Sequence, residues 1–227
     1  MDASLGPRAL LGALRLGSAA LPIGAFAYSQ GLEQAVALGS VSDRASAARW
    51  VEGLLKASVM PCDAAVLARL HAAWRTADES AIRRWNDFLY ATRASRELRD
   101  EERQLGGALF RLLLGLGEER ARAWLRDRRA TLASAFALAG VSFGIPTAEL
   151  CLTYGFAWAE AQVGAATRLV PLGQTDAQLV LSAATTTIEA ELAAALARDD
   201  DEIFSTAPGQ ALLSAAHETQ YSRLFRS

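Results

Sequence analysis

The residue types that most often do chemistry in proteins are scarce in this chain. It has two histidines, His71 and His217, two cysteines and a single lysine, Lys56. His217-Glu218 begins like the zinc motif HExxH, but Tyr221 stands where the second histidine ligand is needed. Lys56 lies between Leu55 and Ala57, so the phosphate-binding sequence GxxxxGK[ST] is absent. These two patterns exclude that zinc-protease motif and a P-loop nucleotide site.

The cysteines also fail to form a recognisable catalytic or metal-binding pattern. Cys62 and Cys151 are far apart, and no CxxC pair, GxSxG elbow or GxGxxG loop occurs. Cys62 beside Met60 and Asp63 could touch a soft metal, although a buried structural thiol is the simpler interpretation. Glu33 could act as an acid or base, but no nucleophile stands near it. We therefore expect no enzymatic activity and no cofactor, and the identity of any metal ligand stays unknown.

The C-terminal residues HETQYSRLFRS, 217–227, look suited to holding a partner. Tyr221, Leu224 and Phe225 alternate there with Arg223 and Arg226, and aromatic and arginine side chains are enriched at interface hot spots. An acidic run, residues 199–202, precedes this segment and predicts a mobile linker. We expect the tail to be able to stay disordered alone and to fold on binding.

The surrounding sequence predicts an all-α protein. Alanine is abundant, aromatic and β-branched residues are few, and no strand-like alternation is long enough to count. We expect a single-domain helical bundle of about ten helices with a flexible C-terminal tail, divided into a body at 1–205 and a tail at 206–227. The predicted helices cover 7–17, about 25–38, 43–61, 63–76, 118–128, 131–142, 147 to about 163 and about 175–198. A longer helix is predicted from 78 through 89, and a second helical run continues to about 114, with 93–103 between them.

Two segments needed a choice between interpretations. In 93–103, acids and bases alternate at helical spacings, which favours a solvated face over a partner surface. The uncharged stretch 130–148 barely reaches membrane-spanning length, and its polar residues favour a buried helix.

A net charge of −2 argues against nucleic-acid and anionic-membrane partners. The few cysteines and the acidic N-terminus predict a cytoplasmic location.

Four motifs resemble the UreF family of urease accessory proteins, in the family's order and spacing. They are LPIGAFAYSQGLE at 21–33, ATRASRELRDEER at 91–103, RLVPLGQ at 168–174 and HETQYSRLFRS at 217–227. The resemblance covers nearly the whole chain. It implies an all-α homodimer that acts as a chaperone or scaffold, binds UreD (also called UreH), recruits and regulates the GTPase UreG, and helps to insert nickel into the urease apoprotein.

By motif position, the resemblance also implies a set of partner-binding residues, some of which line a passage for the ion. Tyr28, Glu33, Arg168 and Arg223 carry the motif positions directly. With the rest of the tail, the predicted partner-binding residues are Tyr28, Glu33, Arg168, His217, Glu218, Tyr221, Arg223, Leu224, Phe225 and Arg226. Ala25 and Ala27 depart from the glycine and serine common in relatives, so no polar role is assigned to them.

Two alternatives to a pure scaffold stay open. Arg168, or an arginine of 93–103, could be supplied to the active site of UreG and stabilise phosphoryl transfer. Alternatively, the chain could hold nickel itself through His217 and Cys62.

Overall fold

The structure, a computed structural model, describes residues 5–227, and within that range every regular element is helical. This confirms the all-α prediction. Short 3₁₀ turns at Ala25–Ala27, Glu119–Trp124 and Asp200–Glu202 and a π-helical segment, Leu55–Ala64, connect the α-helices. The described residues form ten α-helices: α1 Pro7–Leu16, α2 Leu32–Ala37, α3 Arg44–Leu54, α4 Ala65–Thr76, α5 Glu79–Thr92, α6 Arg96–Gly115, α7 Leu132–Phe143, α8 Thr147–Leu169, α9 Gln174–Ala197 and α10 Pro208–His217.

Several helices begin where a short polar side chain caps the first turn. The Asp43 side chain accepts a hydrogen bond from the backbone N–H of Ser46, and the Ser46 hydroxyl oxygen accepts one from the backbone N–H of Asp43. Asp78, Ser95 and Thr131 cap α5, α6 and α7 in the same manner, each accepting from the N–H three residues later. Such caps satisfy backbone donors that have no partner inside the helix, so the sequence predicts these starts well.

Pro61 does not end a helix, contrary to the prediction for 43–61. The chain continues from α3 through Leu55–Ala64 into α4, with Pro61 inside the π-helical segment. A π-helix bonds each N–H one residue farther back than an α-helix does, which widens the turn. That wider turn accommodates the proline ring and its missing N–H. Asp63, predicted to begin a helix, therefore lies within a continuous helical stretch.

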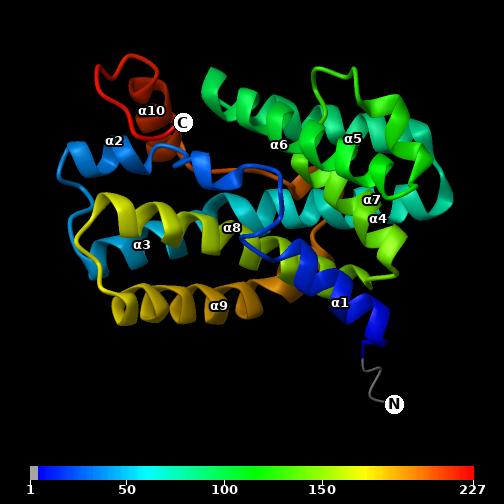
Figure 1. The fold of residues 1–227 in the computed structure, drawn as a ribbon, viewed down its shortest axis with the longest axis horizontal. Coiled ribbons are helices and arrows are strands. Elements are labelled where there is room, and N and C mark those ends of the chain that lie inside the picture. Colours follow the sequence, from blue (N-terminus) through cyan, green and yellow to red (C-terminus); the bar gives the residue numbers. More distant parts are fainter. Residues whose placement is uncertain (1–4) are drawn as a thin grey trace.

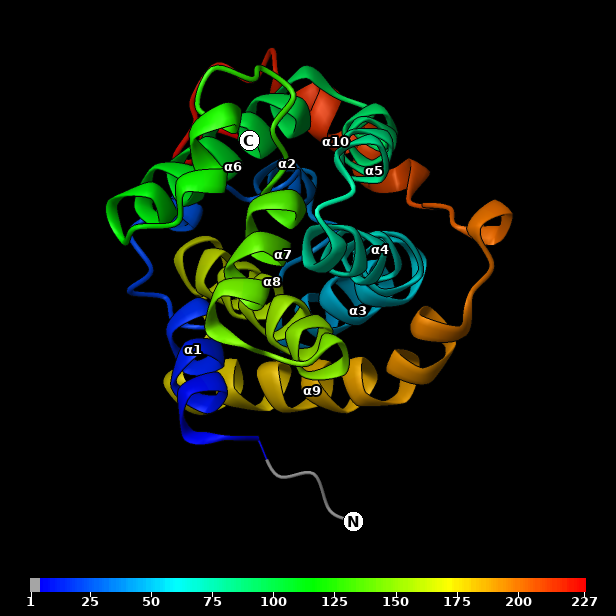
Figure 2. The same ribbon diagram turned by 90° about the vertical axis from the view of Figure 1, so that its right-hand side faces the viewer.

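Helices α7 and α8 lie at the centre, and the other helices surround them (Figures 1 and 2). All of α7 from Ala133 to Gly140 is buried, which confirms the buried-helix interpretation for this part of the stretch 130–148. The helix ends at Phe143, so the stretch is not one continuous helix. Glycines allow the tightest contacts. A Cβ on Gly106 of α6 would lie 2.7 Å from the backbone of Thr131, so the start of α7 can approach α6 only because that side chain is absent.

Among the described residues, one helix, α9, is long and apolar enough to cross a membrane when length and composition alone are considered. In this fold α9 runs along the bundle (Figure 1), with Ala177, Val180, Ala184 and Ile188 buried against the core. A row of buried side chains at this spacing is what a core-facing helix of a bundle needs.

The tail packs on the body, where we expected a flexible segment. After Pro208 the chain forms α10, and the last residues return to α2 and α6 (Figure 1). His217, Phe225 and Ser227 are buried. The acidic linker at 199–202 led us to expect flexibility. The buried carboxylates that bind the tail, Glu33 and Glu97, lie in segments distant in the sequence.

Candidate functional site

The loop from Gly24 to Gly31 forms part of the surface that the tail contacts. Gly24 and Gly31 have φ values of 85° and 88°, which favour glycine because it has no Cβ. A Cβ on Gly31 would also lie 3.0 Å from the backbone nitrogen of Ser214 in α10. The sequence motif at 21–33 therefore encodes a sharply turned loop in close contact with the last helix.

Main-chain hydrogen bonds join the end of the tail to this loop. The N–H groups of Ser29 and Gln30 donate to the main-chain oxygen of Ser227, at 2.6 and 3.1 Å, and the N–H of Arg226 donates to the carbonyl oxygen of Ala27 at 2.8 Å. The Ser29 hydroxyl donates to the same Ser227 oxygen. These bonds set the position of the tail without depending on side-chain identity, except at Ser29.

Glu33 is the main side-chain anchor for the tail. Its Oε1 accepts the N–H of Leu224 at 2.7 Å, and its Oε2 accepts the N–H of Phe225 at 2.9 Å. The same Oε2 lies 3.1 Å from Nε2 of His217. Glu33 is only 7% exposed, and a buried carboxylate needs such partners to offset its loss of water. The role of Glu33 in this geometry is to hold the tail.

His217 lies fully buried between two carboxylates. Its Nδ1 is 2.8 Å from Oε2 of Glu97, while Nε2 faces Glu33. Both ring nitrogens of His217 are therefore engaged with carboxylate oxygens. Arg223 Nη1 donates to the other oxygen of Glu97 at 2.9 Å. Glu33, His217, Glu97 and Arg223 thus form a continuous chain of side-chain contacts, here called the docking network.

The structure brings all ten sequence-predicted residues into one region. Phe225 is buried beside α2, with the Arg168 guanidinium 5.8 Å from its ring centroid. Arg168 also donates to the carbonyl of Phe26 at 3.0 Å. Glu218 accepts the N–H of Arg96 at the start of α6.

Four further predicted residues complete this arrangement. Tyr28 and Arg226 both donate to the amide oxygen of Gln104, at 2.7 and 3.1 Å. Burial raises the pKa of Tyr28 above its ordinary value. Tyr221 and Leu224 point outward, with Tyr221 fully exposed and Leu224 64% exposed. Their role in partner binding stays a prediction.

The solvated-face interpretation of 93–103 is wrong for half of its charged residues. Arg93, Glu97, Glu101 and Glu102 are enclosed by the fold. Arg93 pairs with Asp63 at 2.7 Å and, through Nε, with Glu102 at 2.8 Å. The two carboxylates keep the pKa of Arg93 well above its usual range, despite the opposing effect of burial. Glu97 and Glu101 are four residues apart on α6, a spacing that could have indicated one shared buried face.

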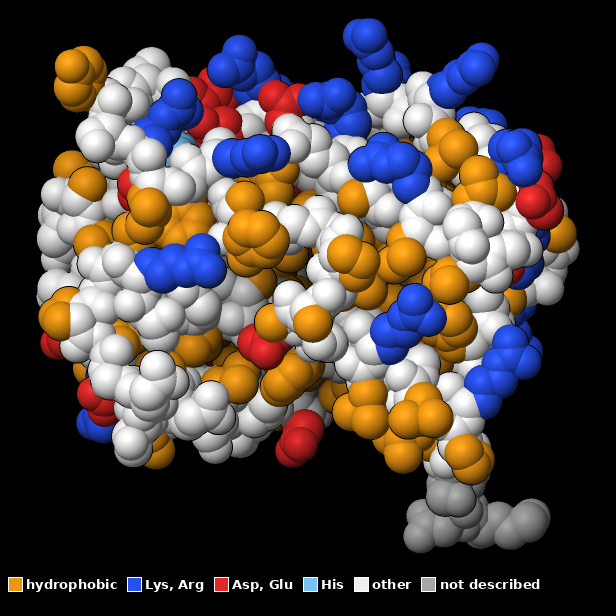
Figure 3. Space-filling view, in the orientation of Figure 1, with side chains coloured by type: hydrophobic (Ala, Val, Ile, Leu, Met, Phe, Trp, Pro, Cys, Tyr) orange, Lys and Arg blue, Asp and Glu red, His pale blue; other side chains and the backbone are white. Residues whose placement is uncertain are grey.

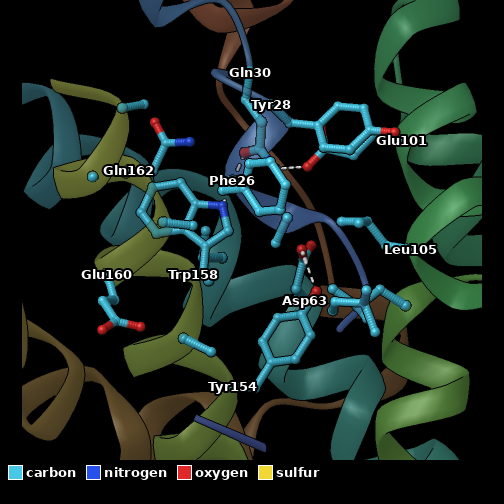
Figure 4. A pocket seen from close by; sticks show the side chains of 18 of the residues that line it. Phe26, Tyr28, Gln30, Asp63, Glu101, Leu105, Tyr154, Trp158, Glu160 and Gln162 are labelled. Carbon is cyan, nitrogen blue, oxygen red and sulfur yellow. Dashed lines mark hydrogen bonds between the residues drawn. The ribbon is translucent and has the colours of Figure 1, made fainter. Parts of the chain in front are cut away.

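A cavity of about 220 Å³ lies beside this buried cluster (Figure 4). Tyr154 and Asp63 face each other across one end, and the Trp158 indole N–H donates to Gln30 at 2.9 Å. Glu101 also lines the cavity, and its carboxylate accepts from Gln30 and from the Ser227 hydroxyl. Burial raises the pKa of Glu101 to about 7. The cavity therefore contacts a carboxyl group that gains or loses its proton near neutral pH.

The residues proposed for nickel do not form a metal site. Within residues 5–227, no group of three or more His, Cys, Asp or Glu side chains is placed to hold a metal ion. Burial raises the pKa of Cys62 and of Cys151 to about 12, which disfavours the metal-binding thiolate. Both ring nitrogens of His217 already face carboxylates. The interpretation of Cys62 as a buried structural thiol agrees with its position, and Cys151 is buried as well.

A family model and individual relatives both match this chain, and they carry the same family description. A model of the UreF family matches residues 41–185. The urease accessory protein UreF of Chromohalobacter salexigens is 45% identical over 221 residues, which cover 97% of this chain and 96% of that protein. The urease accessory protein UreF of Teredinibacter turnerae is 47% identical over 220 residues, covering 96% and 98%. That of Alkalilimnicola ehrlichii is 44% identical over 210 residues, covering 92% of each.

Proposed function

The chain belongs to the UreF family of urease accessory proteins, and from this premise we propose that it is a non-catalytic scaffold for assembling the nickel centre of urease. In this proposal the chain binds UreD/UreH, and the resulting complex recruits the GTPase UreG and regulates it. The complex acts on the urease apoprotein in the cytoplasm, and the chain forms a homodimer. A family of accessory proteins fits a chain that has few catalytic residues.

The docked tail is the observation that carries this proposal. The docking network holds the tail backbone, and this leaves Tyr221 and Leu224 turned away from the body. Leu212 on α10 and Phe26 in the loop are also exposed, at 72% and 64%. Exposed aromatic and leucine side chains on a well-anchored frame suit a protein interface, because their conformation is largely set before binding. We assign this surface to UreD/UreH.

Capture of UreD/UreH by single-residue variants tests this assignment. Tyr221→Ala and Leu224→Ala remove exposed side chains that make few contacts within the chain, so the fold should persist. We expect each variant to weaken capture by about tenfold or more, as truncation of an interface hot spot does. Leu116→Ala is the matched control, because Leu116 is an exposed leucine at the end of α6. Capture that is equal in all three variants contradicts the assignment.

The cavity supports the passage for the nickel ion that the family resemblance implies. Its polar side chains include Asp63, Glu101 and Glu160, and carboxylate oxygens can exchange with the water around a divalent cation. A passage needs weak contacts, whereas a metallochaperone needs a tight site. Titration of nickel into the isolated chain separates the two: we expect no saturable tight binding, and stoichiometric uptake contradicts the passage.

The alternative in which Arg168 acts on the GTPase has less support. Its guanidinium is engaged with the Phe26 carbonyl and lies against the Phe225 ring. These contacts suit a residue that braces the loop and the tail. Arg168→Lys keeps the charge but loses the planar guanidinium. If Arg168 only braces the tail, single-turnover GTP hydrolysis by UreG in a fully assembled complex should be unchanged by this substitution.

A further inference from the structure

A groove next to the cavity lies between α6, the segment 125–128 and the end of the tail, and it shares Ile23 and Tyr28 with the lining of the cavity. Its volume is about 330 Å³. Arginines dominate its lining: Arg103, Arg111, Arg126, Arg128 and Arg226. All five are exposed, and Lys and Arg side chains gather along the upper edge of the molecule over α6 (Figure 3). We call this feature the arginine groove.

The positive charge of the arginine groove is poorly balanced. Asp127 is the one carboxylate in its lining among the described residues, and it is already engaged with Arg83 and with the N–H of Arg129. Arg103 pairs with Asp100 at 3.2 Å. Within residues 5–227, the other four arginines of the groove have no carboxylate at ion-pair distance. A net positive groove therefore exists on a chain whose overall charge is −2.

The docked tail supplies part of this groove. Arg226 belongs to the tail, and its N–H donates to Ala27 while its guanidinium donates to Gln104 of α6. Tyr28, which also lines the groove, donates to the same Gln104 oxygen. Release of the tail would remove Arg226 and one wall, so the groove is complete only when the tail is docked.

The spacing of the arginines favours an extended acidic segment over a single phosphate. Arg103 and Arg111 are eight residues apart on α6, which corresponds to about 12 Å along the helix. Gly107 lies between them in the groove lining and adds no side chain. An extended peptide covers about 12 Å with roughly four residues. A phosphate could reach only one part of this row, and no glycine-rich phosphate loop occurs in the chain.

We propose that the arginine groove binds a short acidic segment of a partner protein, about four extended residues rich in Asp and Glu, and that the docked tail completes the site through Arg226. Guanidinium groups pair well with carboxylates because their donors match the two carboxylate oxygens. This inference goes beyond the proposed function, since it does not depend on the identity of UreD/UreH or UreG as the partner.

Fluorescence anisotropy of the full chain with a labelled Glu/Asp octapeptide tests the proposal. We expect saturable binding that weakens as salt rises, because exposed charges are screened. Arg111→Glu combined with Arg128→Glu should weaken binding by about tenfold, since two attractions become repulsions. Arg226→Ser should weaken it by about threefold. Arg75→Glu is the matched control, an exposed arginine on α4 outside the groove, and should leave binding unchanged.

Several results would overturn the proposal. The first is no saturable peptide binding, or equal binding by the wild type and the Arg111/Arg128 double variant. Equal loss in the Arg75→Glu control would indicate a non-specific charge effect. Displacement of the peptide by an equal concentration of inorganic phosphate or GTP would assign the groove to a phosphate ligand. Tighter binding of a single-stranded oligonucleotide would assign it to nucleic acid. Failure of this experiment leaves capture of UreD/UreH through Tyr221 and Leu224 unaffected.

Discussion

Replacing Glu33 by alanine should release the tail while leaving the body folded. The substitution removes two charge-assisted hydrogen bonds to the N–H groups of Leu224 and Phe225, and it leaves Nε2 of His217 without its carboxylate. Each such bond contributes about 1.5–3 kcal/mol, so the docked tail loses about 3–6 kcal/mol. Ordering the backbone of about ten tail residues costs roughly 10 kcal/mol or more. The free energy of the contacts that hold the tail and the entropy cost of ordering it are similar in size. The loss of the bonds to Glu33 is therefore enough to undock the tail.

Hydrogen exchange at the amides of Leu224 and Phe225 measures this effect directly. In the wild type both amides are bonded to Glu33, so their exchange should be slow. In Glu33→Ala we expect their protection to fall by about a hundredfold or more, since every 1.4 kcal/mol corresponds to about tenfold. The amide of Leu109, inside α6, reports on the body and should keep its protection.

Two further variants sharpen the test of Glu33. Glu33→Gln keeps one acceptor oxygen but turns an amide NH₂ toward a backbone donor, so we expect a loss of protection between those of the wild type and the alanine variant. Glu189→Ala removes an exposed glutamate on α9 and should change nothing at the tail. Unchanged exchange at Leu224 and Phe225 in Glu33→Ala would refute the reasoning that Glu33 anchors the tail.

Three other predictions concern the fold. The free energy of unfolding should fall by roughly 3 kcal/mol as pH rises from about 4.5 to 7. The reason is that the folded state keeps the proton of Glu101 (pKa about 7) up to a higher pH than the unfolded chain does. Denaturant titrations at several pH values measure this dependence, which should be weaker in Glu101→Gln. Arg93→Ala should cost about 3–5 kcal/mol in the same assay, since it leaves buried carboxylates unpaired, whereas Arg96→Ala at an exposed position should cost under about 1 kcal/mol. Gly106→Ala should lower the melting temperature through a backbone clash worth about 1–3 kcal/mol, whereas Gly107→Ala should raise it slightly, by up to about 1 kcal/mol; the opposite order would contradict the tight contact at Gly106.

The helical class and most helix starts could be predicted from sequence because they depend on neighbouring residues. Alanine content, apolar spacing at helical periods and capping residues such as Asp43 and Asp78 act over one or two turns. Pro61 is the exception. Local rules predict a break, but the surrounding helices hold the chain in a wider helical turn there.

The residues of the site could also be found in the sequence, but their relations could not. The motifs at 21–33 and 217–227 predicted Glu33, His217 and Arg223 to be partner-binding residues. That Glu33 and His217 lie in contact is a long-range fact, since 184 positions separate them. Glu97 was missed because the alternating charges of 93–103 resemble an exposed helix when only local spacing is considered.

The sequence by itself determined that this chain is helical, poor in catalytic groups and equipped with an aromatic and arginine-rich end. Only the tertiary structure decided which charges are buried and what the tail touches. The physical reason is that burial and ion pairing depend on which distant segments share a surface. Local sequence would allow Arg93 and Glu97 to be solvated. They are enclosed because Asp63, in the π-helical segment, pairs with Arg93 and because His217, at the end of α10, contacts Glu97. The sequence predicted a flexible tail. In the structure the tail is held on the body, because Glu33 and Glu97 accept hydrogen bonds from its N–H and guanidinium groups.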